Sequence, residues 1–211
     1  EAVGLFTAGV FLPDHPHSKK WRHLGLKWFN KAIQRQIAAN GEYIQHSTNY
    51  HRMMLMLSLW MNALLLGQGS ELDQSIKEKL SCAVTWLYTH YDQLSGKVSN
   101  LGHNDGAHIL PFSSSPYDDF RPILSAASRA FSGKPILEPG EWDDLSSWLG
   151  IPSIDHSAAS SPESGYRIGN KSSWASLRAV KYKSRPAHAD QLQVDLWYQG
   201  YNIARDPGTY Q

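Results

Sequence analysis

Cysteine is nearly absent from this sequence of 211 residues, which contains a single one, Cys82. One cysteine excludes an internal disulfide and any cysteine-rich zinc module. Cys82 lies within an apolar pattern of helical spacing. We therefore interpret it as a small core residue rather than as a nucleophile.

An excess of charge of one sign is also lacking. Twenty Lys and Arg face 19 Asp and Glu, which gives a formal net charge of +1. Such a balance offers no strong overall field for binding nucleic acid or an anionic membrane. Lys19 and Lys20, beside His15 and His17, are interpreted as the solvated start of a helix.

Long hydrophobic runs are missing too. The longest, Met53–Leu66, is shorter than the roughly 20 residues that a membrane-spanning helix needs, so no membrane insertion is predicted. The chain begins at Glu1 without a methionine or a basic leader, and it ends in a turn-like Asp-Pro-Gly segment. We therefore expect a fragment of a longer protein. Its 41% hydrophobic content is enough to form a core.

The first part of the chain has helical periodicity. Helices are predicted at Ser18–Gly41, Thr48–Leu66, Ser70–Gly96, 118–131 and 141–148. The second has apolar residues on all sides, which predicts a helix surrounded by other helices. Ser70 and Asp73 form the pattern of a capping box at the start of the third.

The periodicity then changes from helical to alternating. Residues 166–168, 174–180 and 192–197 alternate apolar and polar side chains, which predicts strands of an antiparallel sheet. A segment rich in Ser and Pro precedes them and is typical of a linker. The sequence thus predicts an α+β protein with a helical domain over 1–150, a linker over 151–163 and a truncated β-domain over 164–211.

The N-terminal end of the Thr48–Leu66 helix carries a first candidate site. A helix N-terminus favours anions, and Tyr50, His51 and Arg52 add a phenol, an imidazole and a fixed cation. A tyrosine is a poor acid or base at neutral pH unless nearby cations stabilise the phenolate, and His51 and Arg52 are residues of the right type. Alternatively, Ser47 or Thr48 caps the helix and Tyr50 packs in the core with its hydroxyl bonded.

Two further groups combine histidines with carboxylates. His188 and Asp190 lie on one face of a predicted strand, upstream of Asp206, and can form either part of a zinc site or an ion pair that braces the strand. His103 and Asp105, together with Asn104 and His108, lie either in an ordinary turn or along a cleft.

Three strings resemble the heparinase II/III-like family of polysaccharide lyases. They are EAVGLFTAG at Glu1–Gly9, STNYH at Ser47–His51, and the series HADQL, DLW, G and DPGTY between His188 and Tyr210. Their order and their distances along the chain also fit the family. The last series is the most specific of the three, and together the strings cover nearly the whole chain.

The resemblance implies a fold and a reaction. The fold is an incomplete (α/α) toroid of helix pairs followed by a truncated antiparallel β-sandwich, with a cleft that binds acidic polysaccharide. The reaction is β-elimination at uronic acids, with Tyr50 either as the acid alone or as both acid and base, and His51 in support. The substrate-binding residues expected from this reading are Asn49, Arg52, His103, Asn104, Asp105 and Arg185.

The resemblance also implies a cofactor and a compartment. His188 and Asp206 match positions that hold a structural zinc ion near the cleft, and no organic cofactor is implied. Lyases of this type are periplasmic or secreted. The resemblance leaves the oligomeric state open.

The sequence departs from the family pattern in ways that favour an alternative. An Asn-His pair expected upstream of Glu1 and a third metal ligand expected beyond Gln211 are outside the chain, so the fragment itself is expected to be inactive. Pro186 stands where many members carry a histidine. The alternative is a non-catalytic protein of the same fold that binds acidic polysaccharide or processes capsule or exopolysaccharide. A third reading, hydrolysis by a carboxylate pair, is weaker because the Asp118/Asp119 and Asp143/Asp144 pairs are adjacent in sequence and point in different directions.

Overall fold

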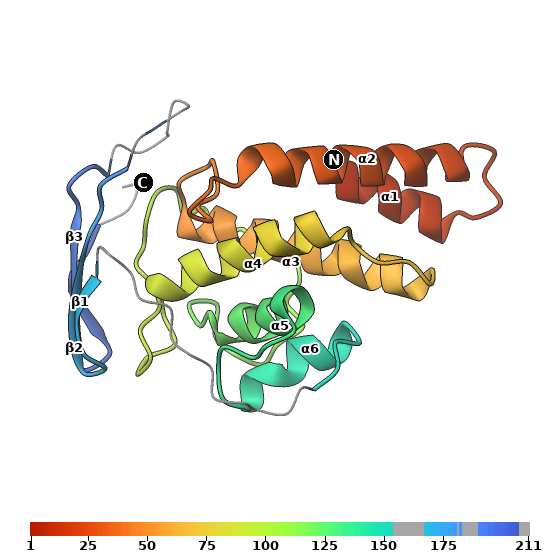
Figure 1. Ribbon diagram of the computed structural model, residues 1–211. Helices are drawn as coiled ribbons and strands as arrows, with labels where there is room; N and C mark the ends of the chain where they lie inside the picture. The colour runs from red at the N-terminus through yellow and green to blue at the C-terminus, as the bar shows by residue number, and fades with distance from the viewer. Residues whose placement is uncertain (154–166, 181, 183–189, 207–211) are drawn as a thin grey trace.

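The computed structural model describes residues 1–153, 167–180, 182 and 190–206. Figure 1 shows a block of helices with a narrow antiparallel sheet standing against one end of it. This arrangement confirms the predicted α+β class. The described residues contain one sheet, and the predicted linker over 151–163 lies mostly outside them.

The helical block forms from six α-helices and one short 3₁₀ helix. Their bounds are α1 Ala2–Phe11, α2 Ser18–Gln36, α3 Thr48–Gly67, α4 Gln74–Thr89, α5 Arg121–Ser132, η1 Glu141–Asp143 and α6 Asp144–Trp148. Each helix predicted from periodicity is present. Helix α1 was not predicted, although its buried residues Val3, Phe6 and Gly9 follow a three-residue spacing.

Helices α1 and α2 form a close antiparallel pair. A Cβ atom on Gly25 would come within 2.8 Å of the carbonyl oxygen of Ala2, and one on Gly9 would come within 2.8 Å of the carbonyl oxygen of Ser18. Because real Cβ atoms do not approach that closely, glycine at both positions lets the two backbones approach each other. The hydroxyl of Ser18 donates to the Gly9 carbonyl at 2.9 Å and closes the pair.

Helix α3 lies at the centre of the core. Leu55, Leu59 and Met61 have no exposed surface, and α1, α4 and α5 pack around the helix. The prediction of a helix surrounded by other helices is therefore confirmed. The most central helix begins at the first candidate site, so the position of that site is fixed by the core.

Helix α4 corrects three predictions. The capping box is wrong because the helix begins after Asp73, whose side chain makes no capping bond. Cys82 is exposed rather than buried, because the buried stripe of α4 passes through Leu80, Ala83 and Leu87 instead. The helix also ends at Thr89, well before Gly96.

The sheet contains four antiparallel strands in sequential order. They are β1 Arg167–Gly169, β2 Ser173–Leu177, β3 Val194–Tyr198 and β4 Tyr201–Ala204, with a register shift between Leu196 and Trp197. The three predicted strands are confirmed, and β4 was not predicted. Alternation divides the sheet into a face toward the helices and a face away from them.

The inner face of the sheet binds the helical block through a few specific contacts. Trp174 and Trp197 stack at 5.4 Å between ring centroids, and the indole nitrogen of Trp174 donates to Asp92 at 2.9 Å. Arg167 donates to the carbonyl of Tyr91 at 2.8 Å. Asp190 accepts a bond from the Gly102 amide at 2.7 Å, and its predicted partner His188 lies outside the described residues. These contacts fix the sheet beside the first candidate site.

The outer face of the sheet is apolar and exposed. Val194, Leu196 and Tyr198 of β3 are 51%, 40% and 51% exposed. Leu177 and Ile168 extend this surface onto β2 and β1. Within the part of the chain that the structure describes, nothing covers this face (Figure 1).

The helices of the structure can also be compared with the length and apolar character that a membrane-spanning helix needs. No helix among the described residues is both long and apolar enough to cross a membrane.

Candidate functional site

The start of α3 is held against the loop that follows α4. Ser47 caps the helix by accepting a bond from the Tyr50 amide at 3.1 Å, and its hydroxyl donates to the carbonyl of His103 at 2.5 Å. Thr48 donates to the Ser99 carbonyl at 2.9 Å. Gly102 has a φ of 66°, and a side chain there would collide with Ser47, so glycine lets the loop approach the helix.

Tyr50 and Asp105 form the central contact of the site. The Tyr50 hydroxyl donates to one carboxylate oxygen of Asp105 at 2.6 Å, while the other oxygen accepts from the Ala107 amide at 3.1 Å. This bond to Asp105 raises the pKa of Tyr50 above its ordinary value and lowers the pKa of Asp105. Tyr50 is therefore a neutral phenol at neutral pH. The expectation that His51 and Arg52 stabilise its phenolate stays a prediction.

Asn49 links this pair to a buried cation. Its side-chain oxygen accepts from Arg52 and from the hydroxyl of Tyr117, both at 2.8 Å, and its nitrogen donates to Asp105 at 3.3 Å. Arg52 also donates to the Tyr117 carbonyl, and its guanidinium lies 4.2 Å from the centre of that ring. Burial lowers the pKa of Arg52. These bonds from Arg52 thus fix the positions of Asn49 and Tyr117.

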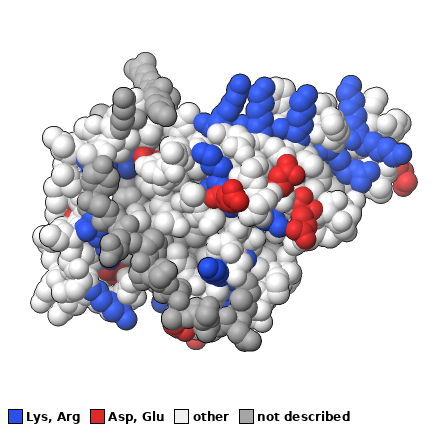
Figure 2. Space-filling view, in the orientation of Figure 1, with Lys and Arg blue, Asp and Glu red and all other residues white. Residues whose placement is uncertain are grey.

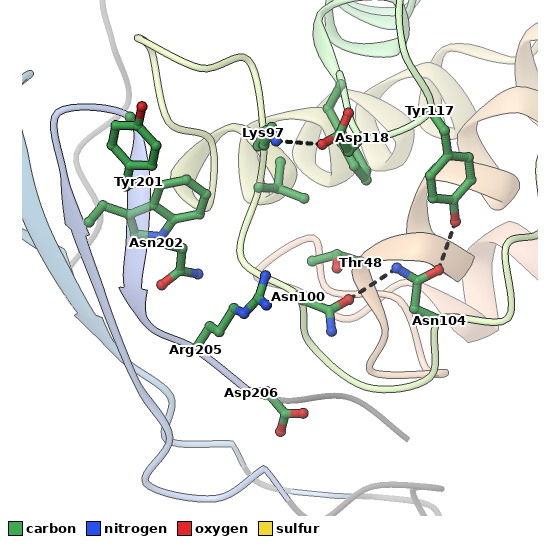
Figure 3. A pocket seen from close by; sticks show the side chains of 14 residues that line it. Thr48, Lys97, Asn100, Asn104, Tyr117, Asp118, Tyr201, Asn202, Arg205 and Asp206 are labelled. Atoms are coloured by element: carbon green, nitrogen blue, oxygen red, sulfur yellow. Dashed lines mark hydrogen bonds and ion pairs between the residues drawn. The ribbon is translucent and has the colours of Figure 1, made fainter. Parts of the chain in front are cut away.

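Asn104 extends the network toward the sheet. Its side-chain oxygen lies 2.7 Å from the Tyr117 hydroxyl, whose single proton bonds either this oxygen or that of Asn49, and its nitrogen donates to Asn100 at 3.1 Å (Figure 3). The structure therefore brings five predicted site residues together: Asn49, Tyr50, Arg52, Asn104 and Asp105. Asn104 and Asp105 also accept bonds from the amides of Gly106 and Ala107, which is turn chemistry, so the turn reading describes this segment and only Asn104 of the group lines a cavity.

His51 lies away from this network. It has no exposed surface, its ring stacks on Trp86 at 4.7 Å, and its Nε2 atom donates to the Ala83 carbonyl at 2.9 Å. Burial lowers its pKa to about 3. A neutral ring facing α4 cannot supply positive charge to Tyr50, so any support from His51 acts through the packing of α3.

A cavity of about 450 Å³ opens between the helical block and the sheet. Its walls come from distant parts of the chain, and Figure 3 shows their side chains converging on one space. The lining residues are Thr48, Lys97, Val98, Asn100, Asn104, Tyr117, Asp118, Phe120, Trp197, Gly200, Tyr201, Asn202, Arg205 and Asp206. Because Asn104 and Tyr117 belong to both, the cavity adjoins the network around Tyr50.

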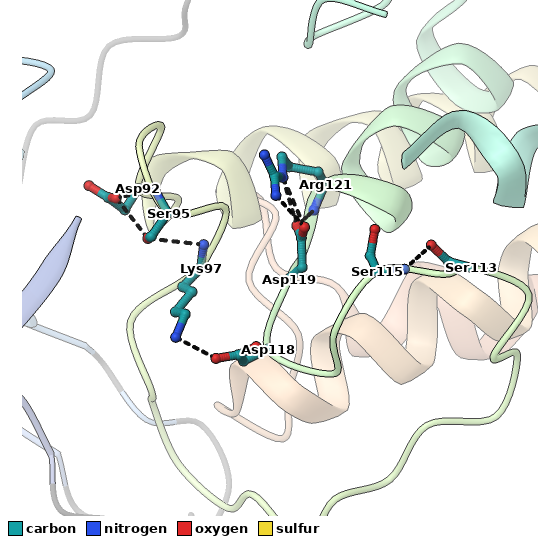
Figure 4. Close-up of polar contacts among 8 residues, drawn as sticks. All are labelled: Asp92, Ser95, Lys97, Ser113, Ser115, Asp118, Asp119 and Arg121. Carbon is teal, nitrogen blue, oxygen red and sulfur yellow. Dashed lines mark hydrogen bonds and ion pairs between the residues drawn. The ribbon is translucent and has the colours of Figure 1, made fainter. Parts of the chain in front are cut away.

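The cavity contains charges of both signs. Lys97 pairs with Asp118 at 2.5 Å (Figure 4). Arg205 points toward Asn100 in Figure 3, and no carboxylate among the described residues pairs with it. The cavity thus offers a guanidinium, amides and aromatic rings, which are groups that can bind a polar, anionic ligand.

The adjacent aspartates bind separate partners, as predicted. In Figure 4, Asp118 reaches Lys97 whereas Asp119 faces Arg121, whose guanidinium donates to it at 2.6 Å. Asp144 accepts from the Ser114 amide and Asp143 from Arg129. Neither pair spans a shared space, so hydrolysis by two facing carboxylates gains no support.

The remaining predicted site residues are partly outside the described chain. Arg185, His188 and Pro186 are not described, whereas Asp206 lines the cavity. His103 is exposed and contributes its carbonyl to Ser47. Among the described residues, no group of three His, Cys, Asp or Glu side chains could hold a metal ion.

Several cavity residues were missed by the sequence analysis. Tyr117 and Lys97 come from loops with no motif, and Tyr201, Asn202 and Arg205 lie on or next to the unpredicted strand β4. Tyr117 lies 68 positions from Asn49, so no local pattern could connect them. The alternation of residues 201–204 after a Gly-containing turn was the one available signal for β4.

A known protein family matches the first half of the chain. The family described as Heparinase II/III N-terminus matches residues 1–108. No significant match was found among curated proteins.

Solved structures resemble the chain over nearly its whole length. A heparan sulfate lyase HepC mutant from Pedobacter heparinus has a TM-score of 0.64 at 19% identity and covers 100% of this chain and 32% of that one. A heparinase III crystal structure has a TM-score of 0.65 at 18% identity and covers 98% and 34%. The chain therefore spans about a third of the length of the solved structures it matches.

At these identities the structures show a shared fold, and the family match supplies the classification. It covers residues 1–108 of 211, just over half of the sequence, and includes the Ser47–His51 string and the loop that carries Asp105. The chain belongs to the heparinase II/III family.

Proposed function

We propose that the protein is a polysaccharide lyase that cleaves uronic-acid-containing polysaccharide by β-elimination, with Tyr50 as the proton donor. The observation that carries this proposal is the Tyr50 hydroxyl, held at 2.6 Å from Asp105 in a network that also lines a polar cavity. The matched structures named as a heparan sulfate lyase and a heparinase III support the substrate class.

The chemistry of β-elimination suits a neutral phenol. A base removes the proton on the carbon next to the uronate carboxylate, the electron pair forms a carbon–carbon double bond, and the glycosidic C–O bond breaks. An acid must protonate the departing oxygen. Because the bond to Asp105 keeps Tyr50 protonated at neutral pH, Tyr50 suits the role of acid. For Tyr50 to act as the base as well, its phenolate would have to form beside the Asp105 carboxylate, which repels it.

The substrate carboxylate needs a positive partner, because removal of the neighbouring proton builds up negative charge. Arg205 is the cavity residue best suited to this role, since no described carboxylate neutralises it. Arg52 is buried and bonded to Asn49 and Tyr117, so it acts by holding the walls of the site. Arg185 remains a further proposed contact.

A structural zinc ion at His188 and Asp206 remains a proposal. Asp206 lines the cavity, and His188 is not described. A closed zinc site needs about four ligands, and two are named here. No step of the proposed reaction is assigned to a metal.

We also propose the larger architecture that the resemblance implies. The helices would form part of an (α/α) toroid, and the sheet would form one layer of a β-sandwich. The exposed apolar outer face of β3 supports this, because an uncovered apolar sheet face is costly in water. Export to the periplasm or the cell exterior belongs to the same proposal.

The test uses the full-length protein and a panel of alginate, heparan-type, chondroitin-type and neutral polysaccharides. Elimination creates a conjugated double bond that absorbs in the ultraviolet. We expect absorbance to rise with one acidic polymer, and Tyr50→Phe to slow the rise at least about a hundredfold. An equal rate with Tyr50→Phe would contradict the proposed role of Tyr50.

The alternative is a protein that binds acidic polysaccharide without cleaving it. One observation favours it: the only proton on the Tyr50 hydroxyl is donated to Asp105 rather than left free for a leaving group. Retention of intact polymer with no absorbance change and no new chain ends would support binding without catalysis. New reducing ends without absorbance would indicate hydrolysis.

A further inference from the structure

Helix α2 concentrates positive charge in a protein that is almost neutral. Its 19 residues contain six Lys and Arg and no Asp or Glu, whereas the whole chain has a net charge of +1. Figure 2 shows a row of Lys and Arg side chains projecting along the edge formed by α2. The near-zero net charge of the whole chain hides this local excess of positive charge on α2.

The basic residues share one exposed face. Lys20, Lys27 and Lys31 lie at spacings of seven and four residues, which places them in one line along the helix. Arg35 continues the row at one flank. The buried residues Ser18, Gly25, Phe29 and Ile33 occupy the opposite side. From Lys20 to Arg35 the row is about 22 Å long.

The cations of α2 are not neutralised within the described chain. None of the six, Lys19, Lys20, Arg22, Lys27, Lys31 and Arg35, forms a salt bridge with a described residue. Lys31 instead lies 4.5 Å from the ring centre of Trp28, a side chain that is 50% exposed. The face therefore presents free cations beside an open aromatic ring.

Helix stability does not explain this arrangement. Lys27 and Lys31, and likewise Lys31 and Arg35, are like charges four residues apart, which disfavours a helix. Lys19 and Lys20 lie in the first turn, where the helix dipole favours acids instead. A row of charges that opposes its own helix indicates a partner of opposite charge.

We propose that the exposed face of α2, defined by Lys20, Lys27, Trp28, Lys31 and Arg35, is a second, non-catalytic surface that binds an acidic polysaccharide chain. The row matches an extended polyanion, because its cations repeat along a line. The Trp28 ring adds an apolar surface on which a sugar ring can stack. That the polyanion is a polysaccharide rests on the proposed function. The row of charges on α2 is observed independently of that function.

Such a surface would act apart from the cavity. The cavity lies where α3 meets the sheet, and no α2 residue lines it. A polymer bound along α2 would stay near the protein after each cleavage and raise the local concentration of further sites. Lys19 and Lys20, which the sequence suggested were a solvated helix start, belong to this charged helix.

The experiment compares two charge-matched double variants of the full-length protein. Both carry Tyr50→Phe, so that binding is measured without turnover. One is Lys27→Glu with Lys31→Glu on α2. The other is Lys134→Glu with Lys171→Glu, two exposed lysines outside α2 and outside the cavity. The probes are heparin, alginate, neutral dextran and duplex DNA, each at several salt concentrations.

We expect the α2 variant to bind heparin or alginate at least about tenfold more weakly at low salt and to lose part of the salt dependence. The Lys134/Lys171 variant should stay within about twofold of the parent. Trp28→Ala should weaken polysaccharide binding without changing the salt dependence.

Three results would overturn the proposal: equal weakening by both double variants, no weakening by either, or tighter binding to duplex DNA than to both acidic polysaccharides. Because the assay needs no turnover, the comparison also holds if the parent proves to have no lyase activity. That outcome would overturn the proposed function alone.

Discussion

Arg178, which directly follows β2, donates to Glu42 at 2.8 Å and joins the sheet to the turn before α3 across 136 positions of sequence. Glu42 also bonds His46 at 3.0 Å, and the side chains of Arg178 and Glu42 are 4% and 7% exposed. A buried carboxylate with two cationic or potentially cationic partners is a strong constraint, because loss of one member leaves a charge without compensation.

The substitution Glu42→Ala should therefore weaken the contact between the sheet and the helices more than it destabilises either part on its own. We expect a loss of about 3 kcal/mol in the free energy of unfolding, because Arg178 would remain buried without a carboxylate. Denaturant titration followed by tryptophan fluorescence would measure it, since Trp174 and Trp197 lie in this interface. Glu71→Ala, at an exposed salt bridge, is the control. Equal losses in both variants would contradict the special role of Glu42.

Asp105→Asn should alter the pH dependence of activity. The Asp105 carboxylate raises the pKa of Tyr50, so its neutralisation should lower that pKa. If Tyr50 is the proton donor, the alkaline limb of the rate profile should move to lower pH, because the phenol ionises sooner. Rates between pH 6 and 11 would be compared with those of Asp14→Asn, an exposed aspartate between α1 and α2. An unchanged alkaline limb would contradict the assignment.

Two histidines, the buried His51 and the partly buried His90, should make the fold sensitive to acid. Burial lowers the pKa values of His51 and His90 to about 3, below the usual value of 6.5. The unfolded chain therefore binds protons that the folded chain does not, starting near pH 6.5. Stability should be full above that pH and fall toward pH 3, by roughly 1.4 kcal/mol per pH unit for each histidine.

Thermal unfolding at pH 7, 6 and 5 would measure this loss. We expect His51→Gln together with His90→Gln to flatten the pH dependence, even if the double variant is less stable at pH 7. His23→Gln, an exposed histidine on α2, should leave the slope unchanged. A parent protein equally stable from pH 7 to 5 would show that the two rings take up protons without unfolding.

The outer face of the sheet should bind hydrophobic dyes in a chain limited to residues 1–211. Val194 and Leu196 are largely exposed there, and an apolar sheet face in water binds such dyes. Val194→Thr together with Leu196→Thr should reduce dye fluorescence, and the full-length protein should give little fluorescence if a second sheet covers this face. Strong fluorescence from the folded full-length protein would contradict the proposed sandwich.

Periodicity predicted most of the helical block because its helices bury regular stripes. It missed α1, whose ten residues are apolar on nearly all sides, so the spacing of its buried residues does not stand out from the rest of the helix. It also misplaced Cys82, because the helical pattern does not show which face a neighbouring helix covers. Strand β4 was missed because none of its four residues is buried and only Asn202 is partly buried. Packing against the core therefore imposes little pattern on its sequence.

The site was predictable in parts. The Ser47–Arg52 string and the Asn104–Asp105 turn were each recognised, but the contact between Tyr50 and Asp105 spans 55 positions. Two residues that are so far apart in the sequence share no local pattern from which their contact could be predicted. For His51, its place beside Tyr50 in sequence suggested a joint role, whereas consecutive helical residues point about 100° apart and the ring faces α4.

The walls of the cavity come from two distant parts of the chain. Thr48, Lys97 and Asn104 belong to the helical part, and Asn202 and Arg205 lie on or next to β4. A ligand that fills the cavity must contact both parts at once, and it would lose its contacts with one of them if they separated. Its binding free energy would then be added to the cohesion between the sheet and the helices. A saturated protein should therefore melt as one cooperative unit at a higher temperature, whereas the empty protein can release its sheet first.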